Sequence, residues 1–219
     1  MALDPIAPPT WGWTVILPLK GGSAAKSRLG GGPRLARAIA LDCLDAVLAC
    51  PDVRRVLVVT AHAGTAADAR AAGADVVRES LPGAGLVAAV RDGVAAAGPG
   101  PAAVLLGDLP ALRPEDLATG LRATAAALAT GELAAVPDAE GSGTVLLAAR
   151  DAAHLDPAFG PDSLAAHRRR GAVVVVPALG DDGARLRHDV DTPADLHAAV
   201  ALGVGHRTAV LLRGARSAS

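Results

Sequence analysis

Apolar residues fall into two alternating patterns along the chain. Short runs rich in Val, Leu and Ala are typical of β-strands, and longer stretches with apolar residues at three- and four-residue spacing are typical of helices. We expect strands at residues 14–19, 55–60, 74–77, 102–106, 133–136, 144–148 and 172–176. We expect helices at residues 34–50, 65–72, 85–97, 114–129 and 162–170, and a further one from Thr192. Strands that alternate with helices predict an α/β fold with a mostly parallel sheet.

Two strand segments, 56–59 and 173–176, are apolar at every position. Strands of this kind are covered on both faces, so we expect three layers, with helices on each side of the sheet. The segment 131–149 departs from the alternation, because residues 137–143 join two strand runs with no helix between them. We interpret this segment as an antiparallel or irregular insertion, which makes the sheet mixed.

The length and composition fit one domain. A chain of 219 residues with 51% apolar residues is long enough to bury its own core and short for two domains. We expect the domain at residues 13–202, an N-terminal extension at 1–12, and a C-terminal tail with a short helix at 203–219. The sequence leaves open whether the chain is monomeric or forms a homodimer.

Charge and residue usage exclude several classes of partner. The formal net charge is −1 and aromatic residues make up 1% of the chain, so we expect no binding of nucleic acid. The sequence shows no secretory signal and no segment apolar enough to span a membrane. Cys43 and Cys50 fit small core residues in a reducing compartment better than a redox or metal site. These features predict a cytoplasmic protein.

In an open α/β sheet, ligands bind beyond the carboxyl ends of the strands, so the residues that follow each strand are the candidates for chemistry. The first strand is followed by a glycine-containing loop that carries three cations, Lys20, Lys26 and Arg28. Such a loop is suited to neutralising a triphosphate, although it lacks the glycine that a Walker A motif needs at position 25. The alternative is a flexible, solvated turn.

Aspartates follow two other predicted strands. Asp108 stands at the end of an apolar central strand in Gly-Asp-Leu-Pro, where a hard metal ion such as Mg²⁺ is the natural partner of a carboxylate. Asp189 and Asp191 precede a helix that Thr192 is able to cap, and in an extended segment they point to opposite faces. We therefore expect one of the two at the site and prefer Asp191. The alternatives are a turn-capping aspartate and an acidic loop at a helix start.

Two further segments offer small and hydroxyl-bearing residues, and neither is specific alone. They contain Gly160 and Ser163 at one helix start, and Thr144 after a Gly-Ser-Gly run. The six histidines show no metal-ligand spacing and are expected at surface or helix positions. The chain has no Gly-x-Ser-x-Gly motif, which disfavours a Ser-His-Asp hydrolase.

Four motifs in this order resemble the guanylyltransferases of deazaflavin coenzyme (F-420) biosynthesis, which act on phosphoenolpyruvate or 2-phospho-L-lactate. They are Pro-Leu-Lys…Ala-Lys-Ser-Arg-Leu at 18–29, Gly-Asp-Leu-Pro-Ala-Leu at 107–112, Phe-Gly-x-x-Ser at 159–163 and Asp-Val-Asp-Thr-Pro-x-Asp-Leu at 189–196. The resemblance implies a Rossmann-like nucleotidyltransferase fold of the glycosyltransferase-A type and a reaction with GTP. It also implies a set of site residues: Mg²⁺ at Asp108 and at Asp189 or Asp191, catalytic cations at Lys20, Lys26 and Arg28, phosphoenolpyruvate at Thr144, Gly160 and Ser163, and the nucleotide at Gly21, Lys26 and Gly85.

The chain departs from the family pattern at two positions. Val87 stands where the family has Asn, on the side of the nucleobase, and Val145 stands where the phospholactate branch often has Asn. The second departure favours phosphoenolpyruvate as the acceptor. The alternatives are 2-phospho-L-lactate, a sugar phosphate or a molybdopterin as the acceptor, or a module that binds a nucleotide without catalysis.

Overall fold

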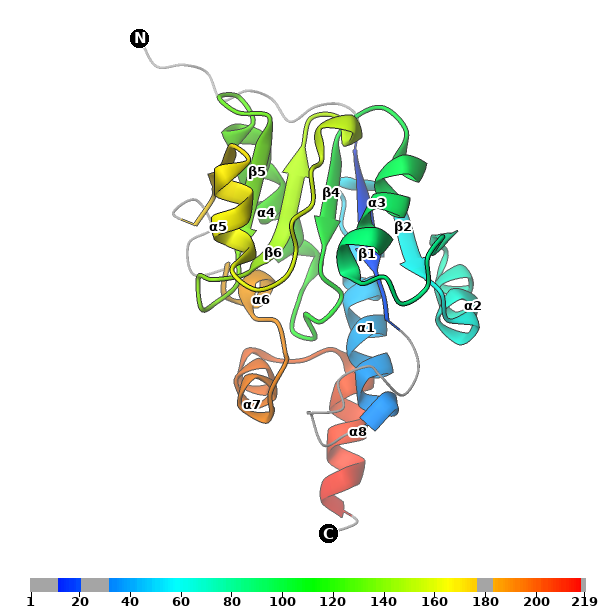
Figure 1. Ribbon diagram of the computed structural model, residues 1–219. Helices are drawn as coiled ribbons and strands as arrows, with labels where there is room; N and C mark the ends of the chain where they lie inside the picture. Colours follow the sequence, from blue (N-terminus) through cyan, green and yellow to red (C-terminus); the bar gives the residue numbers. More distant parts are fainter. Residues whose placement is uncertain (1–11, 21–31, 177–182, 218–219) are drawn as a thin grey trace.

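A sheet of seven strands, in the order β3-β2-β1-β4-β6-β5-β7, runs through the middle of the molecule (Figure 1). The computed structural model describes residues 12–20, 32–176 and 183–217. The strands are β1 (Trp13–Pro18), β2 (Val53–Thr60), β3 (Asp75–Arg78), β4 (Ala102–Leu105), β5 (Leu133–Pro137), β6 (Thr144–Ala149) and β7 (Ala172–Val174). The helices are α1 (Gly32–Leu48), α2 (Ala63–Ala72), α3 (Leu86–Ala97), α4 (Pro114–Ala127), α5 (Ser163–Arg169), α6 (Gly183–Arg187), α7 (Pro193–Leu202) and α8 (His206–Ser217), with a short 3₁₀ turn, η2 (Ala152–His154).

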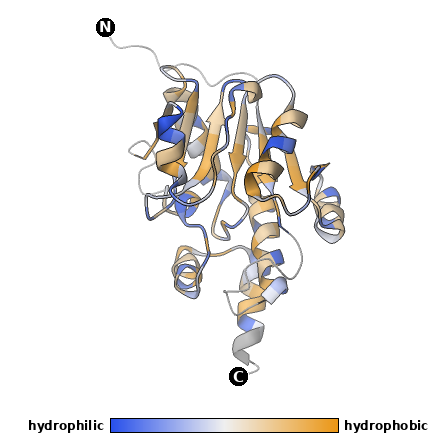
Figure 2. Ribbon diagram, viewed as in Figure 1, coloured by the Kyte–Doolittle hydropathy of each residue, from blue (hydrophilic) through white to orange (hydrophobic). Residues whose placement is uncertain are grey.

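Helices cover both faces of the sheet, which confirms the predicted three layers. Figure 1 shows α3 and α5 on the near side and α1 and α4 on the far side. Alternate residues of β1 enter different cores, since Val15 and Leu17 pack with α1 and α4 whereas Ile16 packs with α3. The strands are accordingly the most apolar elements in Figure 2. The continuous apolar runs in the sequence therefore correctly predicted strands that are buried on both faces.

The predicted insertion is antiparallel. Strand β6 runs opposite to both of its neighbours, β4 and β5, and every other neighbouring pair is parallel. Because β6 is reversed, its first residue, Thr144, lies at the same edge as the carboxyl ends of the parallel strands and pairs with Pro137 at the end of β5. The turn between β5 and β6 therefore belongs to the edge where ligands are expected.

The C-terminal segment packs on the domain more closely than the sequence suggested. Helix α8 lies along α1, and Figure 1 places α7 and α8 beyond the lower edge of the sheet. A small apolar cluster joins these helices to α1 and to the segment after β4 through Leu35, Ile39, Ala111, Val190 and Ala199. The carboxylate of Asp42, on α1, accepts hydrogen bonds from the backbone N–H groups of Arg207 (3.0 Å) and Thr208 (2.8 Å), in the first turn of α8.

Both cysteines belong to the core of the domain. Cys43 and Cys50 are free thiols and buried, as predicted for core residues. Burial is the first cause that raises the pKa of each thiol above its ordinary value. Within the described ranges, no helix combines the length and the apolar character that crossing a membrane requires.

Candidate active site

The segment that follows β4 is anchored by the C-terminal part of the chain. The carbonyl of Asp108 accepts a hydrogen bond from the Val190 N–H at 3.0 Å, and the carbonyl of Pro110 accepts one from the Gly205 N–H at 2.8 Å. Leu109, between them, is fully buried. Asp108 thus stands at the carboxyl edge of the central strand, on a backbone that two long-range hydrogen bonds hold in place.

Of the two later aspartates, Asp189 is the one beside Asp108. Burial raises the pKa of Asp189 to about 7, and the negative charge of Asp108 is the next cause. Asp191 is exposed, and its backbone N–H donates to the Asp195 carboxylate at 3.0 Å. Val190, between them, is buried, and the side chain that turns inward is that of Asp189 rather than that of the preferred Asp191. Which of the two binds a metal stays a prediction.

The N-terminus of α7 is capped as predicted, by residues other than Asp189 and Asp191. Thr192 accepts from the Asp195 N–H at 3.3 Å, while the Asp195 carboxylate accepts from the Thr192 N–H at 2.7 Å. Pro193 occupies the first helical position. This reciprocal capping satisfies the start of α7 without Asp189.

Asp108 and Asp189 suit a hard divalent cation. Burial, and then the negative charge of Asp108, raise the pKa of Asp189, and a bound cation would offset both effects. Mg²⁺ takes one or two carboxylates and completes its shell with phosphate oxygens and water. No cluster of three or more His, Cys, Asp or Glu ligands occurs in the described part of the chain, so this pair is not a closed all-protein cage. Binding of Mg²⁺ at these residues stays a prediction.

A third aspartate organises the turn between β5 and β6. The Asp138 carboxylate accepts hydrogen bonds from the N–H groups of Gly141 (2.6 Å), Ser142 (3.0 Å) and Gly143 (2.7 Å). Arg187, on α6, donates to the carbonyls of Pro137 (3.1 Å) and Asp138 (2.7 Å). The carboxylate and the arginine together give this turn one conformation.

The three residues expected to contact the acceptor lie on connected segments. Thr144 and Ser163 are each 2% exposed, and the N–H of Leu164, next to Ser163, donates to the Ser142 carbonyl at 3.1 Å. Gly160 has a φ of 142°, which favours glycine, and its carbonyl accepts from the Ser163 N–H at 3.2 Å. The fold therefore brings Thr144 and Ser163 together although nineteen positions separate them in the sequence.

His167, one turn after Ser163 on α5, lies beneath this cluster. It is fully buried and contacts Thr144 Oγ1 through Nδ1 at 2.9 Å, while Nε2 accepts from the Ala158 N–H at 2.9 Å. Burial, and then the charge of Arg170, lower the pKa of His167 to about 4. His167 occupies a helix position, one of the two kinds of position expected for the histidines, and on that helix it is a core residue.

The remaining predicted residues divide into two groups. Lys20, two residues after the end of β1, is exposed, and Gly85, with a φ of 96°, precedes α3. Both follow strands whose carboxyl ends face the edge described above. Gly21, Lys26 and Arg28 lie outside the described residues, so their predicted contacts with a nucleotide stay predictions.

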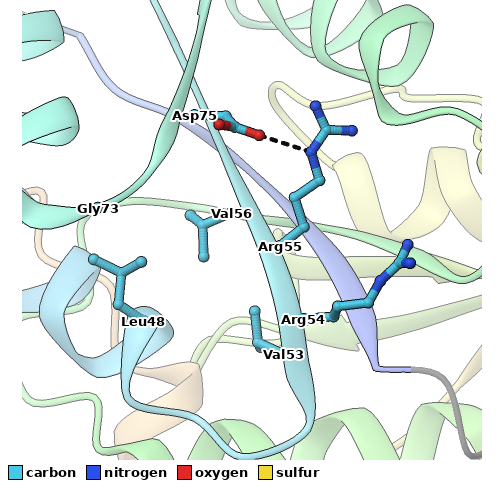
Figure 3. A pocket seen from close by; sticks show the side chains of 7 residues that line it. All are labelled: Leu48, Val53, Arg54, Arg55, Val56, Gly73 and Asp75. Carbon is cyan, nitrogen blue, oxygen red and sulfur yellow. Dashed lines mark hydrogen bonds and ion pairs between the residues drawn. The ribbon is translucent and has the colours of Figure 1, made fainter.

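A hollow of about 270 Å³ at the opposite edge has no part in this arrangement (Figure 3). It lies at the start of β2, lined by Val53, Arg54 and Val56 among others. Arg55 is held there by Asp75 at 2.8 Å, as the dashed line in Figure 3 marks. Among the described residues, none of the predicted site residues lines this hollow.

Sequence reasoning missed Asp138, Arg187 and His167. Asp138 had a local signal, since an aspartate ahead of Gly-Ser-Gly favours a turn that its side chain caps. His167 had a weaker one, because it stands four positions after Ser163 and so on the same face of a helix. Arg187 had none, as its partners are 49 and 50 positions away.

Comparison with known proteins adds two kinds of relative. Residues 21–153 match the family model of the MobA-like NTP transferase domain. The chain is 49% identical over 205 residues to the phosphoenolpyruvate guanylyltransferase of Salinispora arenicola, a match that covers 91% of this chain and 92% of the relative. It is 46% identical over 209 residues to the protein of the same name in Streptomyces coelicolor, covering 91% of this chain and 95% of the relative.

Solved structures show the fold. A nucleotidyl transferase from Methanothermobacter superposes with a TM-score of 0.58 at 20% identity, covering 87% of this chain and 97% of the other. A 4-diphosphocytidyl-2C-methyl-D-erythritol synthase from Anaerococcus prevotii superposes with a TM-score of 0.53 at 15% identity, covering 87% and 95%. The nucleotidyltransferase fold expected from the sequence is therefore confirmed.

Proposed function

Because the chain belongs to the family of the phosphoenolpyruvate guanylyltransferases, and so to the nucleotidyltransferases, we propose that it transfers the guanylyl group of GTP to phosphoenolpyruvate. The observation that carries the proposal is that Asp189 lies close enough to Asp108 for the Asp108 charge to raise its pKa, at the same edge as Thr144 and Ser163. One pair of residues is suited to a metal–triphosphate and the other to a small acid.

In the proposed reaction, a phosphate oxygen of phosphoenolpyruvate attacks the α-phosphorus of GTP in line with the leaving group. The new P–O bond forms as the bond to the β-phosphate breaks, which releases pyrophosphate and leaves enolpyruvoyl-diphospho-guanosine. The nucleophile is already an anion, so the site has no need of a strong general base. The main tasks of the protein are to align two polyanions and to offset their repulsion.

The residues divide these tasks. Asp108 and Asp189 would hold Mg²⁺, which would supply positive charge to the triphosphate. Lys20, together with Lys26 and Arg28 as the resemblance implies, neutralises the phosphates. The hydrogen bonds from Val190 and Gly205 fix the backbone that carries Asp108, so the metal-binding carboxylate is positioned before substrate arrives.

The acceptor side differs in character. Thr144, Gly160 and Ser163 are neutral, so phosphoenolpyruvate would be recognised there by hydroxyl and backbone donors. We further propose a cytoplasmic location, which the buried free thiols of Cys43 and Cys50 support. We also propose that the product is used in F-420 biosynthesis, as the resemblance implies.

The test is product analysis with defined substrates. The protein is incubated with Mg²⁺, GTP and either phosphoenolpyruvate or 2-phospho-L-lactate, and pyrophosphate release and the product mass are measured. We expect the product from phosphoenolpyruvate at the higher kcat/KM, and no product when EDTA removes the metal. Faster turnover of 2-phospho-L-lactate, of CTP or ATP, or of a sugar phosphate would contradict the proposal.

A further inference from the structure

His167 is buried among groups that fix both of its ring nitrogens. Nε2 lies 2.9 Å from the backbone N–H of Ala158, and Nδ1 lies 2.9 Å from the hydroxyl of Thr144. Phe159 packs edge-on against the ring, with 5.0 Å between ring centroids. The imidazole is therefore held in one place and one orientation.

The proton on this ring follows from its partners. A backbone N–H only donates, so Nε2 must accept and carries no proton. Burial favours the neutral ring, so its single proton is on Nδ1. Nδ1–H then donates to Thr144 Oγ1, which leaves the hydroxyl proton of Thr144 directed to another partner.

This polarity matters for an anionic ligand. Phosphate and carboxylate oxygens accept hydrogen bonds and donate none, so Thr144 is useful to them only as a donor. In the other tautomer, the Thr144 hydroxyl would donate to Nδ1 and would present only lone pairs to the anion. A hydrogen bond received from His167 also polarises the hydroxyl and strengthens its own donation.

We propose that His167 is a positioning residue that sets Thr144 as a hydrogen-bond donor to the anionic acceptor, with the Ala158 N–H fixing the tautomer that allows it. The inference rests on the proposed function for the identity of the acceptor. It assigns a role in acceptor recognition to a residue that does not touch the acceptor itself. A purely structural alternative is that His167 only ties the 155–159 segment to α5.

Two substitutions separate the two roles. In His167→Asn, the side-chain amide N–H replaces Nδ1–H and donates to Thr144, while the acceptor for Ala158 is lost. In His167→Gln, the longer side chain places its carbonyl where Nε2 was, so Ala158 keeps its acceptor and Thr144 loses its donor. We expect His167→Gln to raise the KM for phosphoenolpyruvate at least ~10-fold, the effect of losing a hydrogen bond to a charged group, with the KM for GTP within about twofold. We expect His167→Asn to stay within about threefold of wild type for both.

A double-mutant cycle adds a second readout. In a Thr144→Val background, His167→Gln should raise the KM for the acceptor no further, because the hydroxyl that it orients is gone. Thr144→Ser should keep the dependence on His167. Additive effects in the Val background, a larger acceptor defect in His167→Asn than in His167→Gln, or equal changes in both KM values overturn the proposal. Circular dichroism confirms that each variant is folded.

The tautomer is measured without turnover. Long-range ¹H–¹⁵N correlation spectra of histidine-labelled protein distinguish the two neutral tautomers, and we expect the proton of His167 on Nδ1. A proton on Nε2 overturns the proposal even if the protein makes the expected product. The kinetic comparison uses whichever anionic acceptor the wild-type protein converts. Absence of product from phosphoenolpyruvate therefore contradicts the proposed function alone, and the role of His167 is judged separately.

Discussion

The carboxylate of Asp42 caps, from α1, the first turn of a helix that begins 164 positions later. Its removal tests how the C-terminal segment is held. Its side chain is 3% exposed and accepts from the N–H groups of Arg207 and Thr208. Gly205, just before α8, packs against the Asp42 carboxylate, and its N–H bonds the Pro110 carbonyl beside Asp108. Asp42→Ala therefore removes the cap of α8 close to the segment that carries Asp108.

The size of the effect follows from these contacts. A hydrogen bond to a charged group contributes about 1.5–3 kcal/mol, and a capping side chain replaced by Ala costs about 0.5–2 kcal/mol. Removing the buried charge recovers part of its desolvation cost. We expect Asp42→Ala to lower the free energy of unfolding by about 2–4 kcal/mol. Asp42→Asn keeps one carbonyl acceptor and should fall between Ala and wild type.

The assay combines urea unfolding with amide hydrogen exchange. Exchange at Arg207, Thr208 and Gly205 should speed up in Asp42→Ala, because the first turn of α8 loses its partner. The matched control is Asp45→Ala, which breaks an exposed ion pair to the same Arg207 and should cost less than about 1 kcal/mol. An unfolding free energy of Asp42→Ala within about 0.5 kcal/mol of wild type, or equal effects of the two variants, would refute the reasoning.

Four further outcomes are expected. Asp108→Asn should fold normally and lose at least about a hundredfold in kcat/KM, since one metal carboxylate is gone; near-normal turnover would remove Asp108 from the metal site. Asp189→Asn should lower the affinity for Mg²⁺ much more than Asp191→Asn does, as measured by Mg²⁺ titration of activity, and the reverse order would restore Asp191. Ser163→Ala should raise the KM for phosphoenolpyruvate far more than that for GTP, and equal changes would remove Ser163 from the acceptor side. The depressed pKa of His167 should cost the fold nothing above pH 6.5 and about 2 kcal/mol at pH 5, because the unfolded chain takes up the proton first. We therefore expect the free energy of unfolding to fall less on acidification in His167→Gln than in wild type. Protonation of Asp189 changes stability in the opposite direction, but it occurs in both proteins and cancels in the comparison. Equal losses in the two proteins would contradict the prediction.

Parts of the fold could be predicted from the sequence because they depend on residues that are close together in the chain. The alternation of apolar runs with helical periodicity gave the layers and the mixed sheet, since strand and helix periods differ. Thr192, Pro193 and Asp195 specified the start of α7, because a capping box needs only residues within one turn. Helix α6 was not predicted, as five residues carry too little periodicity to be noticed.

The arrangement of side chains in the site was less accessible. The sequence pointed to both Asp189 and Asp191, and the preferred residue, Asp191, is the exposed one. Alternation along an extended segment predicts that the two side chains point in opposite directions, but it does not predict which of them faces inward. That choice depends on Val190, which packs against α1 and the segment after β4. The burial of His167 depends likewise on Phe159 and β6, which lie far from it in the sequence or across a turn.

By itself, then, the sequence determined the layers, the antiparallel insertion, the capping of α7 and the aspartates at strand ends, because each depends on neighbours within a few positions. Only the tertiary structure decided which aspartate lies beside Asp108, how Asp42 holds α8, and how His167 meets Thr144. These are contacts between segments distant in sequence, and their geometry is set by how the helices pack on the sheet. Which residue types stand at the strand ends is fixed by the local sequence, whereas the relative positions of their side chains depend on the packing of the whole domain.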